Sequence, residues 1–312
     1  MAKTNTRRDN GNILDPIEIQ RSFGHKAADY EKNAWLQREV RSQLYERLED
    51  ITSTQNFSPE TIVDIGCGSG FGTIQLKKTY PKAKVIGLDI ALPMCQQALH
   101  QNKHTWLNNS WLRRSHIQVM QANTLQIPLA DQSVDLLISN MSLQWIEDWP
   151  QLLTGFRRIL RPKGILLFSS LGPDTLLELR KAWATVDQEP HVNEFIDPHI
   201  IADQMLASGF INPVIDVDRI TATYDHAKTL LHDLKNIGAH NANNNRPRGL
   251  TGKAKLAAMY AGYEHFRQDD GRLPATWEVF YAIAWGPEAG QPIRTEHGDL
   301  ATFSVESLRQ SS

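Results

Sequence analysis

The sequence predicts an α/β fold in which helices cover both faces of a mostly parallel sheet. Three observations support this prediction: strand and helix patterns alternate from residue 61 to residue 186, a glycine-rich turn joins the first strand of this series to its first helix, and the second strand ends in an acid. The expected strands are 61–65, 84–89, 116–121, 133–139 and 164–170. The expected helices are 71–79, 93–100, 150–160 and 174–186.

The glycine-rich turn lies in residues 61–72, which read Thr-Ile-Val-Asp-Ile-Gly-Cys-Gly-Ser-Gly-Phe-Gly. Gly66, Gly68 and Gly70 allow a tight turn and let the backbone lie close to a ligand, and the following helix adds free N–H groups. Asp64 stands before the first glycine. This G-x-G-x-G spacing differs from the G-x-G-x-x-G dinucleotide fingerprint. It resembles motif I of the class I S-adenosylmethionine methyltransferases, so we assign these four residues to a cofactor site.

The second strand ends at Asp89, about 20 residues past the glycine turn, where a carboxylate can accept both ribose hydroxyls of an adenosine. Ile90 follows and is assigned to the same site. The alternative role for Asp89 is that of N-cap for the helix 93–100. The two roles are compatible, and the glycine turn upstream favours the ribose role.

Composition excludes several classes of protein. The chain has 312 residues and a formal net charge of −2, so its overall charge gives no argument for nucleic-acid binding. Cys67 and Cys95 provide neither a disulfide framework nor a zinc spacing, and no metal site is expected. No apolar stretch has the length of a membrane span. The polar residues 1–12 lack the apolar segment of a secretory signal, so we expect a cytoplasmic protein.

The rest of the chain is expected to surround a core at 51–223. A disordered start and an N-terminal helical lid are predicted before it, at 1–15 and 16–50. Further along we expect a helix at 198–207, strands at 213–223 and 277–285, and a helical insert between these strands, with helices at 226–237 and 252–267. The domain bounds that follow are 224–275 for the insert, 276–287 for the final strand and 288–312 for a mostly irregular tail. Because the insert leaves the ligand edge of the sheet, it should cap the substrate side.

Polar residues follow the third and fourth strands. Asn123 and Thr124 stand where class I methyltransferases commonly carry an acid for the adenine amine, and the Asn123 carbonyl can still accept from that amine. Asn140, Gln144 and Trp145 lie at the end of the fourth strand, which faces the cofactor's sulfonium in that superfamily. We therefore assign Asn140 to the methionine part and the other two to the surroundings of the methyl group. Trp145 has the alternative of being a core residue.

Several further segments carry a more specific resemblance, for example His-Val-Asn-Glu-Phe at 191–195 and Arg-Gly-Leu-Thr-Gly at 248–252. With these, residues 16–287 resemble the malonyl-[acyl-carrier protein] O-methyltransferases of biotin synthesis. The other segments that carry this resemblance are 23–30, 36–37, 140–145, 168–180, 233–239 and 270–276. Two alternatives stay open. One is a protein similar to the mitochondrial complex I assembly factor that hydroxylates an arginine, and the other is a small-molecule methyltransferase.

The resemblance implies transfer of a methyl group from S-adenosylmethionine to the free carboxylate of malonyl-[acyl-carrier protein], giving the methyl ester that enters biotin (pimeloyl) synthesis. The carboxylate is already ionised, because carboxyl groups titrate at about 4, so no general base is needed. Arginine fits a desolvated carboxylate bidentately. Arg180, Arg246 and Arg272 are the candidates, with Arg180 favoured, and Tyr30 resembles the family's active-site tyrosine.

The resemblance also implies a partner, an acidic acyl carrier protein that presents malonyl-phosphopantetheine. Basic residues of the first helix and of the insert are the candidates for its docking surface. They are Lys26, Lys32, Arg38, Arg41, Lys228, Lys235, Arg246, Arg248, Lys253 and Lys255.

Overall fold

The computed structural model describes residues 14, 16–27, 30–55, 57–106, 116–237, 251–288, 292–295 and 298–301. Its strands are β1 (Thr61–Ile65), β2 (Lys84–Asp89), β3 (Gln118–Gln121), β4 (Val134–Asn140), β5 (Leu160–Leu171), β6 (Ile211–Tyr224), β7 (Leu273–Trp285), β8 (Pro292–Thr295) and β9 (Gly298–Ala301). Its α-helices are α1 (Pro16–Lys26), α2 (Tyr30–Asn33), α3 (Trp35–Gln55), α4 (Phe71–Thr79), α5 (Leu92–Trp106), α6 (Trp149–Ile159), α7 (Leu177–Ala184), α8 (Pro198–Ala207), α9 (Ala227–Asn236) and α10 (Lys253–Glu264). Two 3-10 turns are η1 (Thr124–Gln126) and η2 (Leu143–Trp145).

The main sheet confirms the predicted fold class. Seven strands lie in the order β3-β2-β1-β4-β5-β7-β6. The first five pair in parallel, and β7 runs antiparallel between β5 and β6. The strand order reverses between β1 and β4, and ligands of open α/β sheets bind at the carboxyl ends of the strands at such a point. The glycine-rich turn and the segment after β4 both start there.

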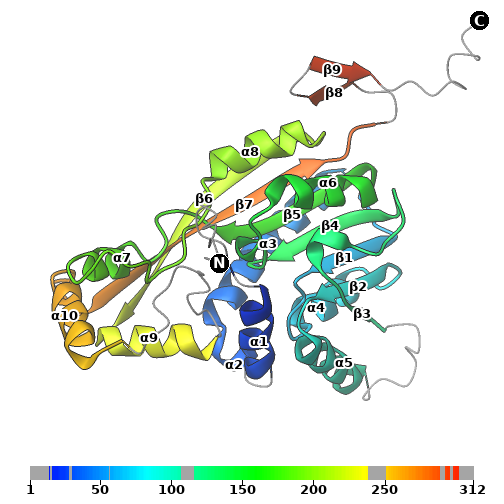
Figure 1. Cartoon of the computed structure of the whole chain (residues 1–312). Helices are drawn as coiled ribbons and strands as arrows, with labels where there is room; N and C mark the ends of the chain where they lie inside the picture. Colours follow the sequence, from blue (N-terminus) through cyan, green and yellow to red (C-terminus); the bar gives the residue numbers. More distant parts are fainter. Residues whose placement is uncertain are drawn as a thin grey trace, which may run out of the picture.

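Alternation of side chains along the strands divides the core into two layers. Ile62 of β1 and Leu136 of β4 belong to the layer beneath α3 and α4, whereas their neighbours Val63 and Leu137 belong to the layer beneath α6 and α8. Successive strand residues point to opposite faces, so strands buried on both sides are apolar throughout. Figure 1 shows the helices on both faces of the sheet, as predicted.

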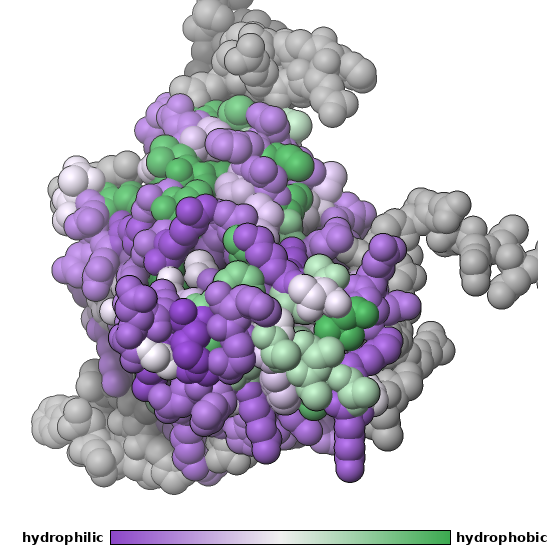
Figure 2. Space-filling view, turned by 90° about the vertical axis from the view of Figure 1, so that its left-hand side faces the viewer, coloured by the Kyte–Doolittle hydropathy of each residue, from purple (hydrophilic) through white to green (hydrophobic). Residues whose placement is uncertain are grey.

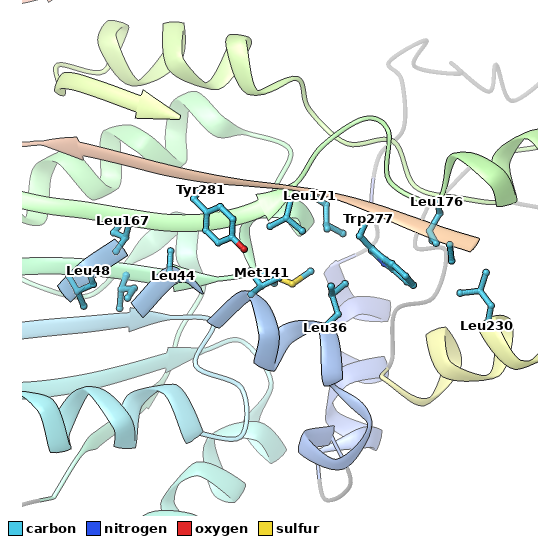
Figure 3. Packing of buried hydrophobic residues seen from close by; sticks show 14 of the residues in the cluster. Leu36, Leu44, Leu48, Met141, Leu167, Leu171, Leu176, Leu230, Trp277 and Tyr281 are labelled. Atoms are coloured by element: carbon cyan, nitrogen blue, oxygen red, sulfur yellow. The ribbon is translucent and has the colours of Figure 1, made fainter. Parts of the chain in front are cut away.

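The first layer continues beyond the sheet proper. In Figure 3, Leu44 and Leu48 of α3 lie beneath the sheet, and Leu36, Trp277 and Leu230 carry the apolar contacts toward α9. The long strands β6 and β7 extend in the same direction, and α7, α9 and α10 cluster at their far end (Figure 1). The insert therefore shares one core with the sheet.

The predicted lid helix 16–50 is not continuous. The structure divides it into α1, α2 and α3, and α3 runs past the expected end at residue 50, as far as Gln55. The division has a physical reason, because the apolar side chains meet different partners. Phe23 and Ala27 pack against Met94 of α5, whereas Val40 packs on the sheet.

The chain ends also differ from expectation. Leu14, within the segment predicted to be disordered, is buried, and its amide donates to the Glu147 carboxylate. In the predicted irregular tail, β8 and β9 form an antiparallel pair. Apart from Glu288, the remaining residues of both segments lie outside the described part of the chain, as do 107–115. Among the described residues, no helix has the length and apolar character needed to cross a membrane.

Candidate active site

A cavity of about 270 Å³ lies at the carboxyl ends of β1, β2 and β4, beneath Leu14, α1 and α2. We call it the cofactor cavity. Most of the predicted site residues line it, and they come from five separate parts of the chain. They are Tyr30, Gly66, Gly68, Asp89, Ile90, Asn123, Thr124, Asn140 and Trp145. The sequence did not single out Ser142, Glu147 and Asp148, which also line it and follow β4.

The glycine turn brings the ends of β1 and β4 together. Gly66 has a φ of 68°, and an added Cβ would lie 2.0 Å from Ser142 Oγ, so this position requires glycine. Gly70 has a different role, because it lines no described cavity and a Cβ there would lie 2.6 Å from the Ala98 Cβ of α5. Gly70 therefore allows the close packing of the glycine turn on α5, and its assignment to cofactor contact stays a prediction.

The Asp89 carboxylate lines the cofactor cavity, as its predicted ribose role requires, but it is not the N-cap of α5, because the first helical bonds go to the Ala91 carbonyl. Oδ2 accepts from Gly68 N at 2.9 Å, and Oδ1 accepts from Ala91 N at 2.8 Å, just before α5 begins. Burial raises the pKa of Asp89, and these backbone donors oppose that shift. Each oxygen accepts one bond from the backbone and keeps capacity for a ligand hydroxyl.

The side chains of the two asparagines in the cofactor cavity already form hydrogen bonds within the protein. Asn123 Oδ1 accepts from Leu125 N at 3.0 Å and so caps η1, which leaves its second lone pair for an adenine amine. Asn140 Nδ2 donates to the Gln37 carbonyl at 2.9 Å, and its Oδ1 accepts from Ser169 Oγ at 2.9 Å. Asn140 thus fixes α3 against the ends of β4 and β5.

A second, mostly apolar cavity of about 90 Å³ adjoins the cofactor cavity. We call it the apolar cavity. Both share a wall made of Phe23, Tyr30, Met141 and Trp145, in which the Phe23 ring meets Tyr30 and Trp145 edge to face, with centroids 6.2 and 5.4 Å apart. Gln144 lines the apolar cavity only; its Nε2 donates to the Met141 carbonyl, and its buried Oε1 has no hydrogen-bond partner.

A third, small polar cavity lies behind the glycine turn and contains Asp64 and Arg41. Asp64 Oδ2 accepts from Thr73 Oγ1 at 2.6 Å. Burial raises the pKa of Asp64 to about 6, opposed by Thr73 and by the Arg41 guanidinium. Arg41 pairs with Glu31 at 2.9 Å, and its side chain is only 17% exposed. Arg41 therefore belongs to this cavity. Its placement on an exposed docking surface, expected from the sequence, is wrong.

Tyr30 alone among the described residues lines all three cavities. Its pKa is raised by burial and then by the nearby Asp89 carboxylate, so the phenol stays protonated at neutral pH. The ring comes from α2, the short element between α1 and α3. Tyr30 therefore lies at the junction of the three spaces.

The predicted arginines do not gather at these cavities. Arg272 pairs with Asp225 at 2.9 Å and donates to the Thr223 carbonyl, so it joins the start of β7 to the end of β6. Arg180 donates to the Thr175 carbonyl at 2.7 Å, its Nε is buried without a hydrogen-bond partner, and it lines none of the described cavities. Burial lowers its pKa. Arg246 lies outside the described residues.

The residues of the cofactor cavity fit S-adenosylmethionine. A Cβ on Gly68 would enter open space, with Tyr30 the nearest group at 4.0 Å, so the missing side chain leaves room for a ligand against the backbone. Asp89 has acceptor capacity that suits ribose hydroxyls, and Ile90 and Leu125 line the cavity with apolar side chains. The polar cavity adds a carboxylate and a guanidinium, which suit the two charged groups of a methionine end.

We expect Asp89→Asn to weaken binding of S-adenosylmethionine by roughly 10- to 100-fold, because the ribose hydroxyls lose a charged acceptor. Titration calorimetry measures this directly. Asp203→Asn on the exposed side of α8 is the matched control and should bind normally. Near-normal affinity in Asp89→Asn would show that the ribose is held elsewhere.

We expect Asp64 to reduce stability as pH rises from about 4 to about 7. Its folded pKa of about 6 exceeds the unfolded value of about 3.9, so the folded protein binds more protons in this window and its free energy of unfolding falls with rising pH. The difference between the folded and unfolded pKa values corresponds to roughly 3 kcal/mol in the free energy of unfolding. Asp64→Asn lacks the effect. Urea unfolding of the wild type and of Asp64→Asn at about pH 4 and about pH 7 measures this effect. A difference in stability between the two proteins that is the same at both pH values contradicts the prediction.

Comparison with known proteins agrees with this geometry. A methyltransferase-domain family matches residues 63–168. The malonyl-[acyl-carrier protein] O-methyltransferase of Xylella fastidiosa is 40% identical to this chain, covering 95% of it and 96% of the relative. The enzyme of that name from Laribacter hongkongensis is 42% identical, covering 93% and 96%.

Solved structures share the fold at much lower identity. The YcgJ protein from Bacillus subtilis is 13% identical, with a TM-score of 0.53, covering 78% of this chain and 99% of its own. A methyltransferase-like protein from Bacillus halodurans has a TM-score of 0.51 at 13% identity, covering 74% and 94%. From its similarity to the curated relatives over nearly its whole length, the chain belongs to the family of the malonyl-[acyl-carrier protein] O-methyltransferases.

Proposed function

We propose that this protein transfers a methyl group from S-adenosylmethionine to the free carboxylate of a malonyl thioester carried by acyl carrier protein. The observation that carries the proposal is the shared wall of Phe23, Tyr30, Met141 and Trp145 between the cofactor cavity and the apolar cavity. A methyl donor on one side and an acyl group on the other would meet at this wall. The resemblance implies that the methyl ester enters biotin synthesis, and the family membership supports this reading.

The cofactor residues divide by the part of the ligand they suit. We assign the ribose to Asp89, the adenine to Asn123, Thr124 and Ile90, and the methionine end to the polar cavity with Asp64 and Arg41. When bound, S-adenosylmethionine would supply an electrophilic methyl group. Trp145 and Met141 would then border that group from the apolar side.

The apolar cavity suits a carboxylate nucleophile for two reasons. Its lining consists mainly of aliphatic and aromatic side chains, which remove water from the attacking oxygen. No Asp or Glu is among its described lining residues, so no fixed negative charge opposes the substrate. The carboxylate is ionised at neutral pH without a general base. The protein's task is alignment and desolvation.

The mouth of this cavity offers a place for an acidic carrier protein. Leu234 of α9 and the C-cap residue Ile237 line the cavity, and Lys228 and Lys235 of the same helix are exposed. Figure 2 shows the face at the end of the molecule that carries α7 and α10, where hydrophilic residues predominate. We assign the two lysines of α9 to carrier docking, since opposite charges at the rim of an interface speed association.

The function is tested with purified protein, S-adenosylmethionine and malonyl-[acyl-carrier protein], read by mass spectrometry. We expect one added methyl group on the malonyl carrier and none on acetyl-[acyl-carrier protein], which has no free carboxylate. A protein that binds S-adenosylmethionine but leaves the malonyl carrier unmodified would overturn the proposed substrate and leave the cofactor assignment standing.

The docking surface is tested by the double variant Lys228→Glu and Lys235→Glu. We expect a several-fold or larger fall in kcat/KM for the malonyl carrier, steepest at low salt, because the charge reversal repels an acidic partner. Lys82→Glu and Lys84→Glu, exposed near the amino end of β2 and away from the ligand edge, are the matched control. Equal effects of the two double variants would remove α9 from the docking surface.

A further inference from the structure

The apolar cavity contains one basic side chain among its described lining residues, that of His191. A carboxylate that enters this cavity loses water and needs a hydrogen-bond donor, preferably a charged one. Neither Arg180 nor Arg272 reaches the lining. The remaining polar residues of the lining are neutral, among them Gln37, Gln144 and Thr175. His191 is therefore the one group there that can offer the substrate a positive charge.

The His191 ring is held from two sides. Its Nε2 lies 2.7 Å from Asp187 Oδ1, and the ring stacks on Trp183 with centroids 3.6 Å apart and an interplanar angle of 8°. Asp187 Oδ2 in turn accepts from Lys255 Nζ of α10 at 2.7 Å. In the described part of the chain the ring makes this one hydrogen bond, which leaves Nδ1 for a ligand.

The charges of this cluster are suited to a further anion. Lys255 first and His191 second lower the pKa of Asp187, so its carboxylate is ionised throughout the physiological range. Lys255 offsets that negative charge from the α10 side, and the charge of a protonated imidazole is then not cancelled within the cluster. A neutral ring that donates from Nε2 presents only a lone pair at Nδ1, whereas the imidazolium donates from both nitrogens.

We propose that His191, as an imidazolium fixed by Asp187 and Trp183, binds the carboxylate of the acyl substrate and makes the protein select a carboxylated acyl group over a neutral one. The proposal rests on the proposed function. Nδ1–H would donate to one carboxylate oxygen and leave the other free to attack. His191 thereby acts as a binding and specificity residue, and it transfers no proton in the methyl-transfer step.

The test compares binding of malonyl- and acetyl-[acyl-carrier protein] to the full chain saturated with S-adenosylhomocysteine, so that no turnover occurs. We expect the wild type to bind the malonyl carrier about 10- to 100-fold more tightly than the acetyl carrier. His191→Phe keeps a ring that can stack on Trp183 but has no donor, and should lose this preference with unchanged affinity for the acetyl carrier. His191→Gln keeps a neutral donor and should retain part of it.

Matched variants separate this role from a structural one. His199→Phe, at an exposed position of α8, should behave as the wild type. Unchanged affinity of the His191 variants for S-adenosylhomocysteine and for the acetyl carrier indicates an intact fold, and His191→Gln serves if His191→Phe fails to fold. A preference as large as that of the wild type in a folded His191 variant overturns the proposal, as does a wild type without preference.

Arg180 is the alternative candidate for binding the carboxylate, because its buried Nε lacks a hydrogen-bond partner. The same binding comparison is therefore made with Arg180→Ala. Loss of the preference in Arg180→Ala together with its retention in both His191 variants would transfer carboxylate recognition to Arg180. The methylation assay on the wild type is independent of these binding ratios. Failure of the proposed function would leave the malonyl carrier unmethylated by the wild type, whereas failure of the His191 proposal leaves methylation intact.

Discussion

The amide side chain of Asn140 connects the parts of the molecule on which the site depends. It donates to the Gln37 carbonyl of α3 and accepts from Ser169 Oγ of β5, and this hydroxyl oxygen accepts from Met141 N at 3.0 Å. One residue at the end of β4 thus fixes the N-terminal helices, the neighbouring strand and the segment that leads to Trp145. Replacing it with an apolar residue would leave buried polar groups unpaired on both sides.

Burial controls the electrostatics of the site more than pairing does. Asp64, Asp89 and Tyr30 lie close together, and burial is the largest cause of the raised pKa of each. A cluster of this kind is unfavourable without a ligand, since two carboxylates are held near one another in a space of low polarity. A cation such as a sulfonium or an ammonium group would relieve that cost. The apolar cavity on the other side of the shared wall has no carboxylate among its described lining residues.

Much of the fold and of the cofactor cavity could be predicted because their signals are local in sequence. The glycine turn, the acid that ends β2 and the alternation of strands and helices each occupy a short segment, and their geometry follows from backbone rules. Arg41 and His191 could not be found in this way. Arg41 reaches the polar cavity because α3 packs across the sheet, and His191 reaches the apolar cavity through a loop fixed by Asp187 and Trp183. The contact of Arg272 with Asp225 could not be predicted for the same reason, since the two residues are distant in sequence.

The position of Phe23 and Tyr30 in the wall shared by the cofactor cavity and the apolar cavity has a consequence for the timing of turnover. Both side chains come from the short helices that precede α3. If the methyl donor and the acyl chain occupy these cavities as proposed, a displacement of this one segment would open both of them to solvent at once. Entry of the two reactants would then depend on the same segment, and the rate at which that segment opens would set an upper limit on the rate of the whole cycle.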